Sequence, residues 1–196
     1  FWYSTIYGVY YFSGCVLGAF CLLIVMIRLL QAAGRLRESV SEEHYQDLGK
    51  YTFGFTVFWA YIAFSQYMLI WYGNIPEETE WYLKRQTGQW VYVSAMLIAG
   101  HFFLPFFLLI SRVPKRRPVV LAAVCLWILV MHWFDVYWLV MPEYSVGRVP
   151  LSWVDLATFV GIGGVCLAGA TLWQRRQPLV PLRDPRLPES LAFENA

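Results

Sequence analysis

The sequence predicts an all-helical membrane protein that crosses the bilayer several times. Of its 196 residues, 59% are hydrophobic and only 14% are charged, whereas a soluble domain has about 25% charged residues. The apolar residues form five long blocks that are separated by short charged segments. Each block reaches the roughly 20 residues that a helix needs to cross the hydrocarbon layer. Because a spanning segment must satisfy its own backbone polar groups in lipid, these blocks favour transmembrane helices.

Five spanning helices and one surface helix follow from these blocks. The expected spanning helices cover residues 1–30, 40–73, 88–112, 118–141 and 151–174. A short helix is expected over 76–86, because Asn74 can cap it, Pro76 suits its first turn, and Glu77 favours its positive end. Residues 174–196 hold four of the 10 prolines, so we expect an irregular Pro-rich tail.

The sequence also predicts where some helices begin and which helix face packs closely against another helix. The segment Ser39–Glu42 fits a capping box for the second spanning helix. Ser152 and Asp155 have the spacing of an N-cap residue and its acidic partner at the start of the fifth. In the first helix, Gly14 and Gly18 form a GxxxG pair, which lets two helices approach closely in lipid.

The basic residues predict an orientation. Twelve of the 15 Lys and Arg residues lie in 28–50, 112–117 and 175–186, which fall on one side of a five-helix path. The positive-inside rule places that side in the cytoplasm, with Phe1 on the opposite side and the tail inside. Phe1 already lies in an apolar run, so we expect this chain to be the C-terminal part of a longer protein.

The cysteines give no sign of a metal or disulfide framework. Cys15, Cys21, Cys125 and Cys166 all fall within expected spans, and no CxxC pair occurs. We therefore expect no iron–sulfur, zinc or other metal site, and buried cysteines that behave as small apolar residues.

Three ionisable residues stand inside the apolar blocks. His132 and Asp135 lie in MHWFDVYWLVMP (Met131–Pro142), and a spacing of three places them on one helix face. An Asp at mid-helix costs about 2.5–3.5 kcal/mol on insertion scales, so such residues usually mark a functional site. His101 lies about 18 Å deep in the third helix. Pro105 should kink that helix and free the backbone carbonyl of His101.

Several readings of these residues remain open at this point. In the first, His101, His132 and Asp135 form a proton relay, because all three side chains can take up and release protons. Residues that would assist this relay are Ser65, Gln66, Tyr61 and Tyr137. In the second, His101 and His132 are the two axial ligands of a b-type haem. A secondary transporter with a broken helix at its substrate site is a third. In a purely structural reading, Asp135 pairs with a His or Tyr to lock the helices together.

Three segments resemble one family of respiratory membrane proteins. They are FGFTVFWAYIAFSQYMLIWYGNIPEETEWYLKR (Phe53–Arg85), GHFFLPFFLLISRVPKR (Gly100–Arg116) and HWFDVYWLVMPE (His132–Glu143). These segments are similar to the NrfD-type membrane subunits of alternative complex III, a bacterial quinol:cytochrome c oxidoreductase. The tail DPRLPESLAFENA (Asp184–Ala196) resembles the end of its F-type subunit. The resemblance covers nearly the whole chain from the second helix onward.

The resemblance implies an architecture and a set of partners. Such subunits have ten helices around two four-helix bundles, so the first four helices here would form the second bundle. It also implies a multi-pass protein of the bacterial inner membrane. Menaquinol is oxidised at the periplasmic side, and iron–sulfur clusters and c-type haems on partner subunits pass electrons to a cytochrome c or an oxidase. Expected partners are a sister NrfD-like subunit, an iron–sulfur subunit and c-type cytochrome subunits, with no nucleic acid. The subunit resembled carries no haem, is thought to lack a bound quinone, and is proposed to conduct protons. We therefore expect no cofactor on this chain and no complete active site.

Overall fold

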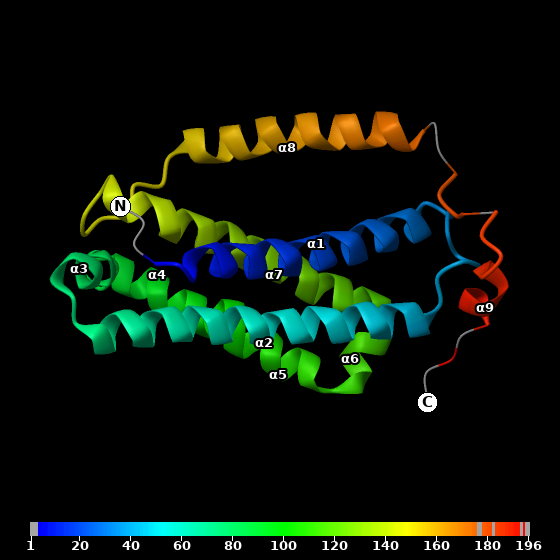
Figure 1. The fold of residues 1–196 in the computed structure, drawn as a ribbon. Coiled ribbons are helices and arrows are strands. Elements are labelled where there is room, and N and C mark those ends of the chain that lie inside the picture. Colours follow the sequence, from blue (N-terminus) through cyan, green and yellow to red (C-terminus); the bar gives the residue numbers. More distant parts are fainter. Residues whose placement is uncertain (1–3, 176–177, 182, 193, 195–196) are drawn as a thin grey trace.

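The computed structural model describes residues 4–175, 178–181, 183–192 and 194. In this part of the chain, five helical segments are long and apolar enough to cross a membrane (Figure 1). They are Tyr7–Ala32, Glu42–Gly73, Trp90–Ile110, Pro118–Glu143 and Trp153–Gln174. The described residues contain no strand. A multi-pass helical membrane protein is therefore the fold class.

The first two spanning helices differ from expectation at their starts. Helix α1 (Tyr7–Ala32) begins at Tyr7, not at residue 1, and residues 1–3 of the expected span lie outside the described residues. Helix α2 (Glu42–Gly73) is capped by Ser41, whose backbone N–H donates to Nδ1 of His44 at 3.2 Å. The capping box expected over residues 39–42 was therefore wrong. Leu36 has a positive φ of 56°, and this turn places Ser39 before the helix.

Helix α3 (Pro76–Arg85) is the expected short helix, with Pro76 in its first turn. Its N-cap residue is Ile75, not Asn74. Asn74 instead ends α2 in the left-handed conformation, with a φ of 48°. Asn adopts this conformation more readily than most residues, which explains why it stands at the turn between the two helices.

The third span is not a continuous α-helix. It consists of α4 (Trp90–Met96), the π-helix η1 (Leu97–Phe103) and α5 (Leu104–Ile110). The N–H of Leu104 bonds the carbonyl of Ala99, five residues earlier. In this register, Pro105 fails to donate to the carbonyl of Gly100, and the indole N–H of Trp127 donates to that carbonyl instead, at 2.8 Å. The sequence prediction of a freed carbonyl at His101 assumed α-helical register and was one residue off.

The long helices pack around α7 (Pro118–Val140), which continues into the 3₁₀ turn η2 (Met141–Glu143). Helix α1 packs along both α2 and α7, and α7 also contacts η1. Helix α2 contacts α5 and the short helix α6 (Arg112–Arg116). One cluster of buried core residues consists of Leu17, Cys21, Ile24, Tyr45, Leu109, Leu121, Val124, Cys125 and Ile128. The loop between α1 and α2 lies at the same end of the molecule as α6, opposite α3 (Figure 1). The basic residues of these two segments therefore share one end.

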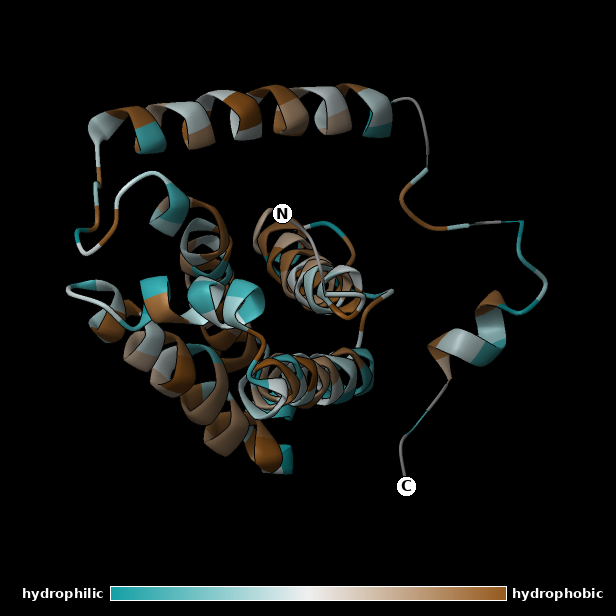
Figure 2. Cartoon of the chain, turned by 60° about the vertical axis from the view of Figure 1, so that its left-hand side comes forward, coloured by the Kyte–Doolittle hydropathy of each residue, from teal (hydrophilic) through white to brown (hydrophobic). Residues whose placement is uncertain are grey.

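Helix α8 (Trp153–Gln174) lies along one side of the other helices (Figures 1 and 2), and the ring of Phe159 on it contacts Trp133 of α7 with 6.4 Å between centroids. None of its described residues is buried, and hydrophobic residues are spread around it (Figure 2). Its expected cap is confirmed: Ser152 accepts the N–H of Val154, and Asp155 accepts the N–H of Ser152 at 2.8 Å. The expected irregular tail contains one short helix, α9 (Leu187–Leu191). Residues 176–177, 182, 193 and 195–196 of that tail lie outside the described residues.

Candidate functional site

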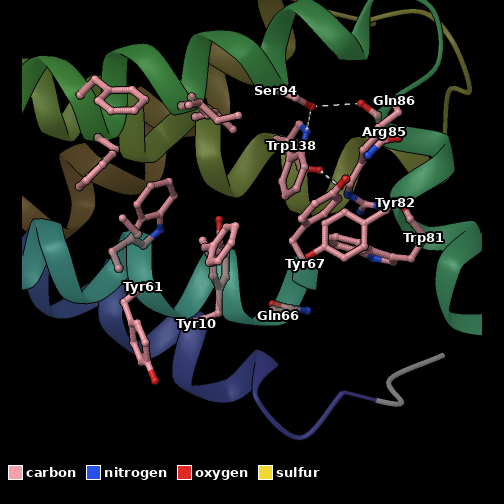
Figure 3. Close-up of a pocket in the computed structure, with 18 of the residues that line it drawn as sticks. Tyr10, Tyr61, Gln66, Tyr67, Trp81, Tyr82, Arg85, Gln86, Ser94 and Trp138 are labelled. Carbon is pink, nitrogen blue, oxygen red and sulfur yellow. Dashed lines mark hydrogen bonds between the residues drawn. The ribbon is translucent and has the colours of Figure 1, made fainter. Parts of the chain in front are cut away.

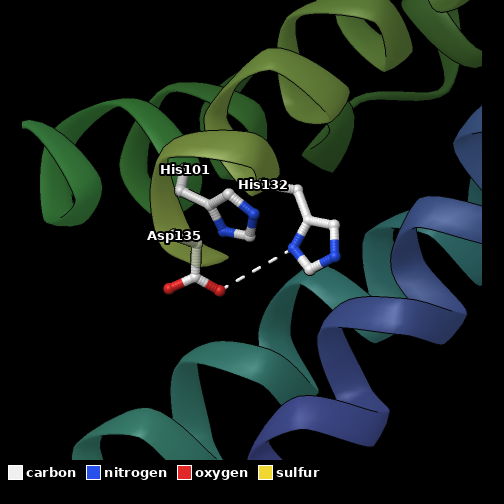
Figure 4. A group of neighbouring side chains, drawn as sticks. All are labelled: His101, His132 and Asp135. Carbon is white, nitrogen blue, oxygen red and sulfur yellow. Dashed lines mark ion pairs between the residues drawn. The ribbon is translucent and has the colours of Figure 1, made fainter. Parts of the chain in front are cut away.

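The three ionisable residues predicted to act together lie together. His101 comes from η1, and His132 and Asp135 come from α7 (Figure 4). One nitrogen of each imidazole and one carboxylate oxygen all lie within 4.8 Å of one another. Nδ1 of His132 is 3.7 Å from Oδ2 of Asp135, an ion-pair distance that is too long for a hydrogen bond. His101 and Asp135 are 0% and 1% exposed, whereas the His132 side chain is 18% exposed.

The carboxylate of Asp135 accepts hydrogen bonds from two other helices. The hydroxyl of Tyr10, on α1, donates to Oδ1 in a short contact. The indole N–H of Trp59, on α2, donates to Oδ2 at 3.1 Å. Both donors are buried. Three spanning helices therefore meet at one carboxylate, and both of its oxygens are held in a fixed orientation.

The histidines, in contrast, have unused hydrogen-bonding capacity. Both ring nitrogens of His101 and Nδ1 of His132 are buried and have no hydrogen-bond partner. The ring of His101 packs on Trp59, with 4.0 Å between centroids, and its centroid is 6.1 Å from that of His132. Buried polar atoms are nearly always paired in native proteins. These nitrogens can take a proton or a ligand without breaking an existing bond.

The glycine pair of α1 makes room for His132. A Cβ atom at Gly14 would lie 2.6 Å from Cε1 of His132, and one at Gly18 would lie 3.4 Å from Cδ2. The GxxxG pair therefore brings α1 against an imidazole of α7. This close approach also carries Tyr10, one turn before Gly14, to Asp135.

The assisting residues expected from the sequence lie elsewhere. Tyr61 is 64% exposed, and Ser65 is half-buried on the same helix. Gln66 is buried and borders a cavity. Tyr137 is buried, its hydroxyl has no hydrogen-bond partner, and its ring stacks on Trp133. Among the described residues, the hydrogen bonds of Asp135 run to Tyr10 and Trp59, which sequence reasoning missed.

Two sequence signals could have found these donors. Tyr10 shares a helix face with Gly14 and Gly18 at four-residue spacing. Trp59 continues a face of α2 that holds Thr52 and Thr56, whose hydroxyls bond carbonyls of their own helix. Both faces carry small or polar residues within otherwise apolar helices, as expected for faces that contact other helices.

A cavity of about 690 Å³ lies next to the cluster (Figure 3). Residues of α2, α3, α4 and η1 line it, and most of them are apolar or aromatic. Tyr10 and Trp59, the two donors to Asp135, also border it. Ser94 contributes a hydroxyl that is already engaged, since it accepts from the indole of Trp138 at 2.9 Å (Figure 3). The cavity therefore suits an apolar occupant.

Arg85 closes the α3 end of this region. It is fully buried, and its guanidinium donates to the carbonyls of Trp81, Trp138 and Leu139 at 2.7, 3.2 and 2.8 Å. Its guanidinium carbon lies 3.3 Å from the centroid of the Trp81 ring, a cation–π contact. Burial lowers the pKa of Arg85 to about 10, and nearby Glu143 opposes this. Arg85 therefore stays charged at neutral pH and anchors α3 to the end of α7.

Comparison with known proteins adds no family assignment. No protein-family model matches the chain, and no curated protein matches it. Function must therefore be inferred from the chemistry of the site and from the resemblance described above.

Proposed function

We propose that this chain is a membrane subunit of a bacterial respiratory quinol:acceptor oxidoreductase, and that its His–Asp cluster conducts protons. One observation carries the proton-conducting role: a buried carboxylate lies within 4.8 Å of two imidazoles inside apolar spanning helices. Ionisable groups at this depth usually serve proton or ion transfer. The identity of the complex rests on the resemblance to NrfD-type subunits. On that basis, menaquinol oxidation in partner subunits drives the proton movement.

The geometry supports proton transfer in two respects. Asp135 accepts from a hydroxyl that can itself both donate and accept, so Tyr10 can pass a proton to or from the carboxylate. His101 and His132 have nitrogens without a hydrogen-bond partner close to the carboxylate, and an imidazole nitrogen can accept or donate a proton. Of the predicted assisting residues, Gln66 is buried and borders the cavity that Tyr10 also lines.

We also propose how the helices are arranged and how the chain is oriented in the membrane. The first four spanning segments act as a four-helix bundle within a larger subunit of the inner membrane. The end with α3 faces the periplasm, and the end with α6 faces the cytoplasm, because the Lys and Arg residues concentrate there. Helix α8 has no buried residue, so it is available to pack against another spanning helix of the complex.

Packing around the histidines disfavours a haem. The 6.1 Å between ring centroids would suit two axial ligands. However, Trp59 packs on His101, Asp135 lies beside His132, and α1 contacts the His132 ring at Gly14. These groups fill the sides of the pair where a porphyrin would extend. A transporter is the second candidate, because the non-α segment η1 lines the cavity.

Co-purification tests the identity of the complex. The tagged protein is extracted from its native membrane in mild detergent, and its partners are identified by mass spectrometry and visible absorption. Multihaem c-type and iron–sulfur subunits are the expected result. A lone protein without haem would favour the transporter, and b-type haem absorption from the lone protein would contradict the proposed mechanism.

The Asp135→Asn variant tests the proton path. The amide keeps the shape of the side chain but lacks its charge. In proteoliposomes, we expect quinol-driven proton uptake or release to fall at least tenfold, with the complex still assembled. Asp155→Asn, at the N-terminal cap of α8, is the matched control and should behave like the wild type. Unchanged proton translocation in Asp135→Asn would exclude the relay, and loss of assembly alone would favour a structural lock.

A further inference from the structure

We propose that His101, His132 and Asp135 also form a binding site for Zn²⁺, and that the bound ion blocks proton transfer through the cluster. The binding itself is independent of the proposed function, whereas the block rests on it. The three donors come from two helices, so only the fold brings them together (Figure 4). The absence of CxxC pairs, which argued against zinc in the sequence, does not bear on a site made of imidazoles and a carboxylate.

The distances suit a transition-metal ion. Three atoms that are at most 4.8 Å apart all lie within about 2.8 Å of a common point, because their enclosing circle has a radius of at most 4.8 Å divided by √3. Zinc binds imidazole nitrogen and carboxylate oxygen at about 2.0–2.2 Å. Each donor atom therefore has to move by less than about 1 Å, which small side-chain rotations provide.

The hydrogen bonding and the chemical types of the three ligand side chains suit a metal ion. The nitrogens of His101 and Nδ1 of His132 have no other partner, so binding breaks no hydrogen bond. Tyr10 and Trp59 hold the carboxylate of Asp135, as outer hydrogen bonds commonly orient a metal ligand. Two nitrogens and one oxygen favour Zn²⁺ over Ca²⁺ or Mg²⁺, which take six or more oxygen ligands. Three protein ligands leave one position of a tetrahedral ion for water.

His132 is the residue through which a zinc ion would reach the cluster. It is the one member of the cluster with an exposed edge, 18% of its side chain, whereas the other two are buried. An ion reaching the cluster therefore meets His132 first. Once bound, Zn²⁺ takes the single lone pair of each neutral imidazole and one lone pair of the carboxylate. The two histidines then have no lone pair left to accept a proton, so a zinc-loaded cluster cannot pass protons through them.

The binding experiment uses the detergent-purified protein with all subunits that co-purify, after treatment with a chelator. Zn²⁺ is titrated against a chromophoric chelator, and Co²⁺ is used as a spectroscopic probe of the ligands. We expect the wild type to bind one Zn²⁺ more per chain than His132→Gln, or to bind it at least tenfold more tightly. The Co²⁺ complex should lack the intense near-ultraviolet band of a thiolate ligand.

The third histidine of the chain supplies the matched control. His44 lies at the start of α2 and accepts a hydrogen bond from Ser41. His44→Gln should bind zinc like the wild type, and His132→Cys, which replaces one zinc ligand by another, should retain binding. Equal zinc affinity and stoichiometry in the wild type and His132→Gln would overturn the proposed site. A thiolate band in the wild-type Co²⁺ complex would do the same.

The block is tested separately. Micromolar Zn²⁺ should lower the proton translocation rate of the wild type at least tenfold, and His44→Gln should be equally sensitive. If zinc binds but does not change the translocation rate, the proposed inhibition is refuted, whereas the proposed binding site stands. Inhibition that needs zinc concentrations far above those that fill the site in the titration would show that zinc acts elsewhere. Failure of the Asp135→Asn test would refute the proposed function but would leave the measured zinc affinity unaffected.

Discussion

The hydrogen bond between Trp127 and Gly100 gives a quantitative test of the π-helical register. The indole N–H donates at 2.8 Å to the carbonyl that Pro105 fails to pair. In Trp127→Phe, this carbonyl loses its partner. An unpaired buried polar group costs about 1–3 kcal/mol, whereas interhelical hydrogen bonds in membrane proteins average about 0.6 kcal/mol. Trp127 is 41% exposed, so we expect a loss of about 1–2 kcal/mol in the free energy of unfolding.

A double-mutant cycle separates the hydrogen bond from the lost ring area. In Pro105→Ala, the new N–H can donate to the Gly100 carbonyl, so that carbonyl no longer needs the indole. Trp127→Phe should then cost about 1 kcal/mol less in the Pro105→Ala background than in the wild type. The free energies are measured by circular dichroism during SDS titration of the protein in mixed micelles. Additive effects, within about 0.5 kcal/mol, would refute the assigned register.

Three further substitutions have defined outcomes. Gly14→Ala places a methyl group 2.6 Å from Cε1 of His132, so it should destabilise the protein by about 1–2 kcal/mol and slow proton translocation; Gly54→Ala, which meets no atom within 4 Å, should not destabilise it. Gly88→Ala should lower the thermal unfolding midpoint, because Gly88 has a φ of +60° and its Cβ would clash with the carbonyl oxygen of Gly147 in the facing loop; an unchanged midpoint would contradict this loop contact. Arg85→Met removes the side-chain hydrogen bonds to three carbonyls and should cost about 2–4 kcal/mol by the same SDS titration; a loss below about 1 kcal/mol would show that Arg85 does not anchor α3.

The spanning segments were predictable because length and hydropathy alone define them. Apolar blocks of about 20 residues have few alternatives in a chain with so few charges. Local signals also located the cap at Ser152 and the helix that begins at Pro76. The start of α2 was harder, because Ser39 and Ser41 both suit an N-cap and only the preceding turn selects between them.

The partners of the carboxylate were not predictable for a physical reason. A helix that is apolar on all sides gives little sign of which face points inward. Tyr7, Tyr10 and Tyr11 are close in sequence, yet it is Tyr10 that is fully buried and donates to Asp135. Similarly, Tyr61 has the residue type of a proton-path member but is exposed. The approach of His101 to Asp135 depends on the π-helical turn, which single-sequence patterns do not reveal.

The π-helix η1 also acts as a register shift between two halves of one span. A π-helical turn holds one residue more than an α-helical turn, so deleting one residue from 97–103 would let the segment become α-helical with both flanking halves still in place. Without a deletion, the same conversion would rotate everything after the segment by about 100° and shift it by about 1.5 Å. Leu109, fully buried in the core, would then turn toward the lipid, while Trp90 before the segment would keep its place. A related protein with one residue fewer in this segment would therefore keep the packing of both halves, and it would lose only the π-helical turn that carries His101.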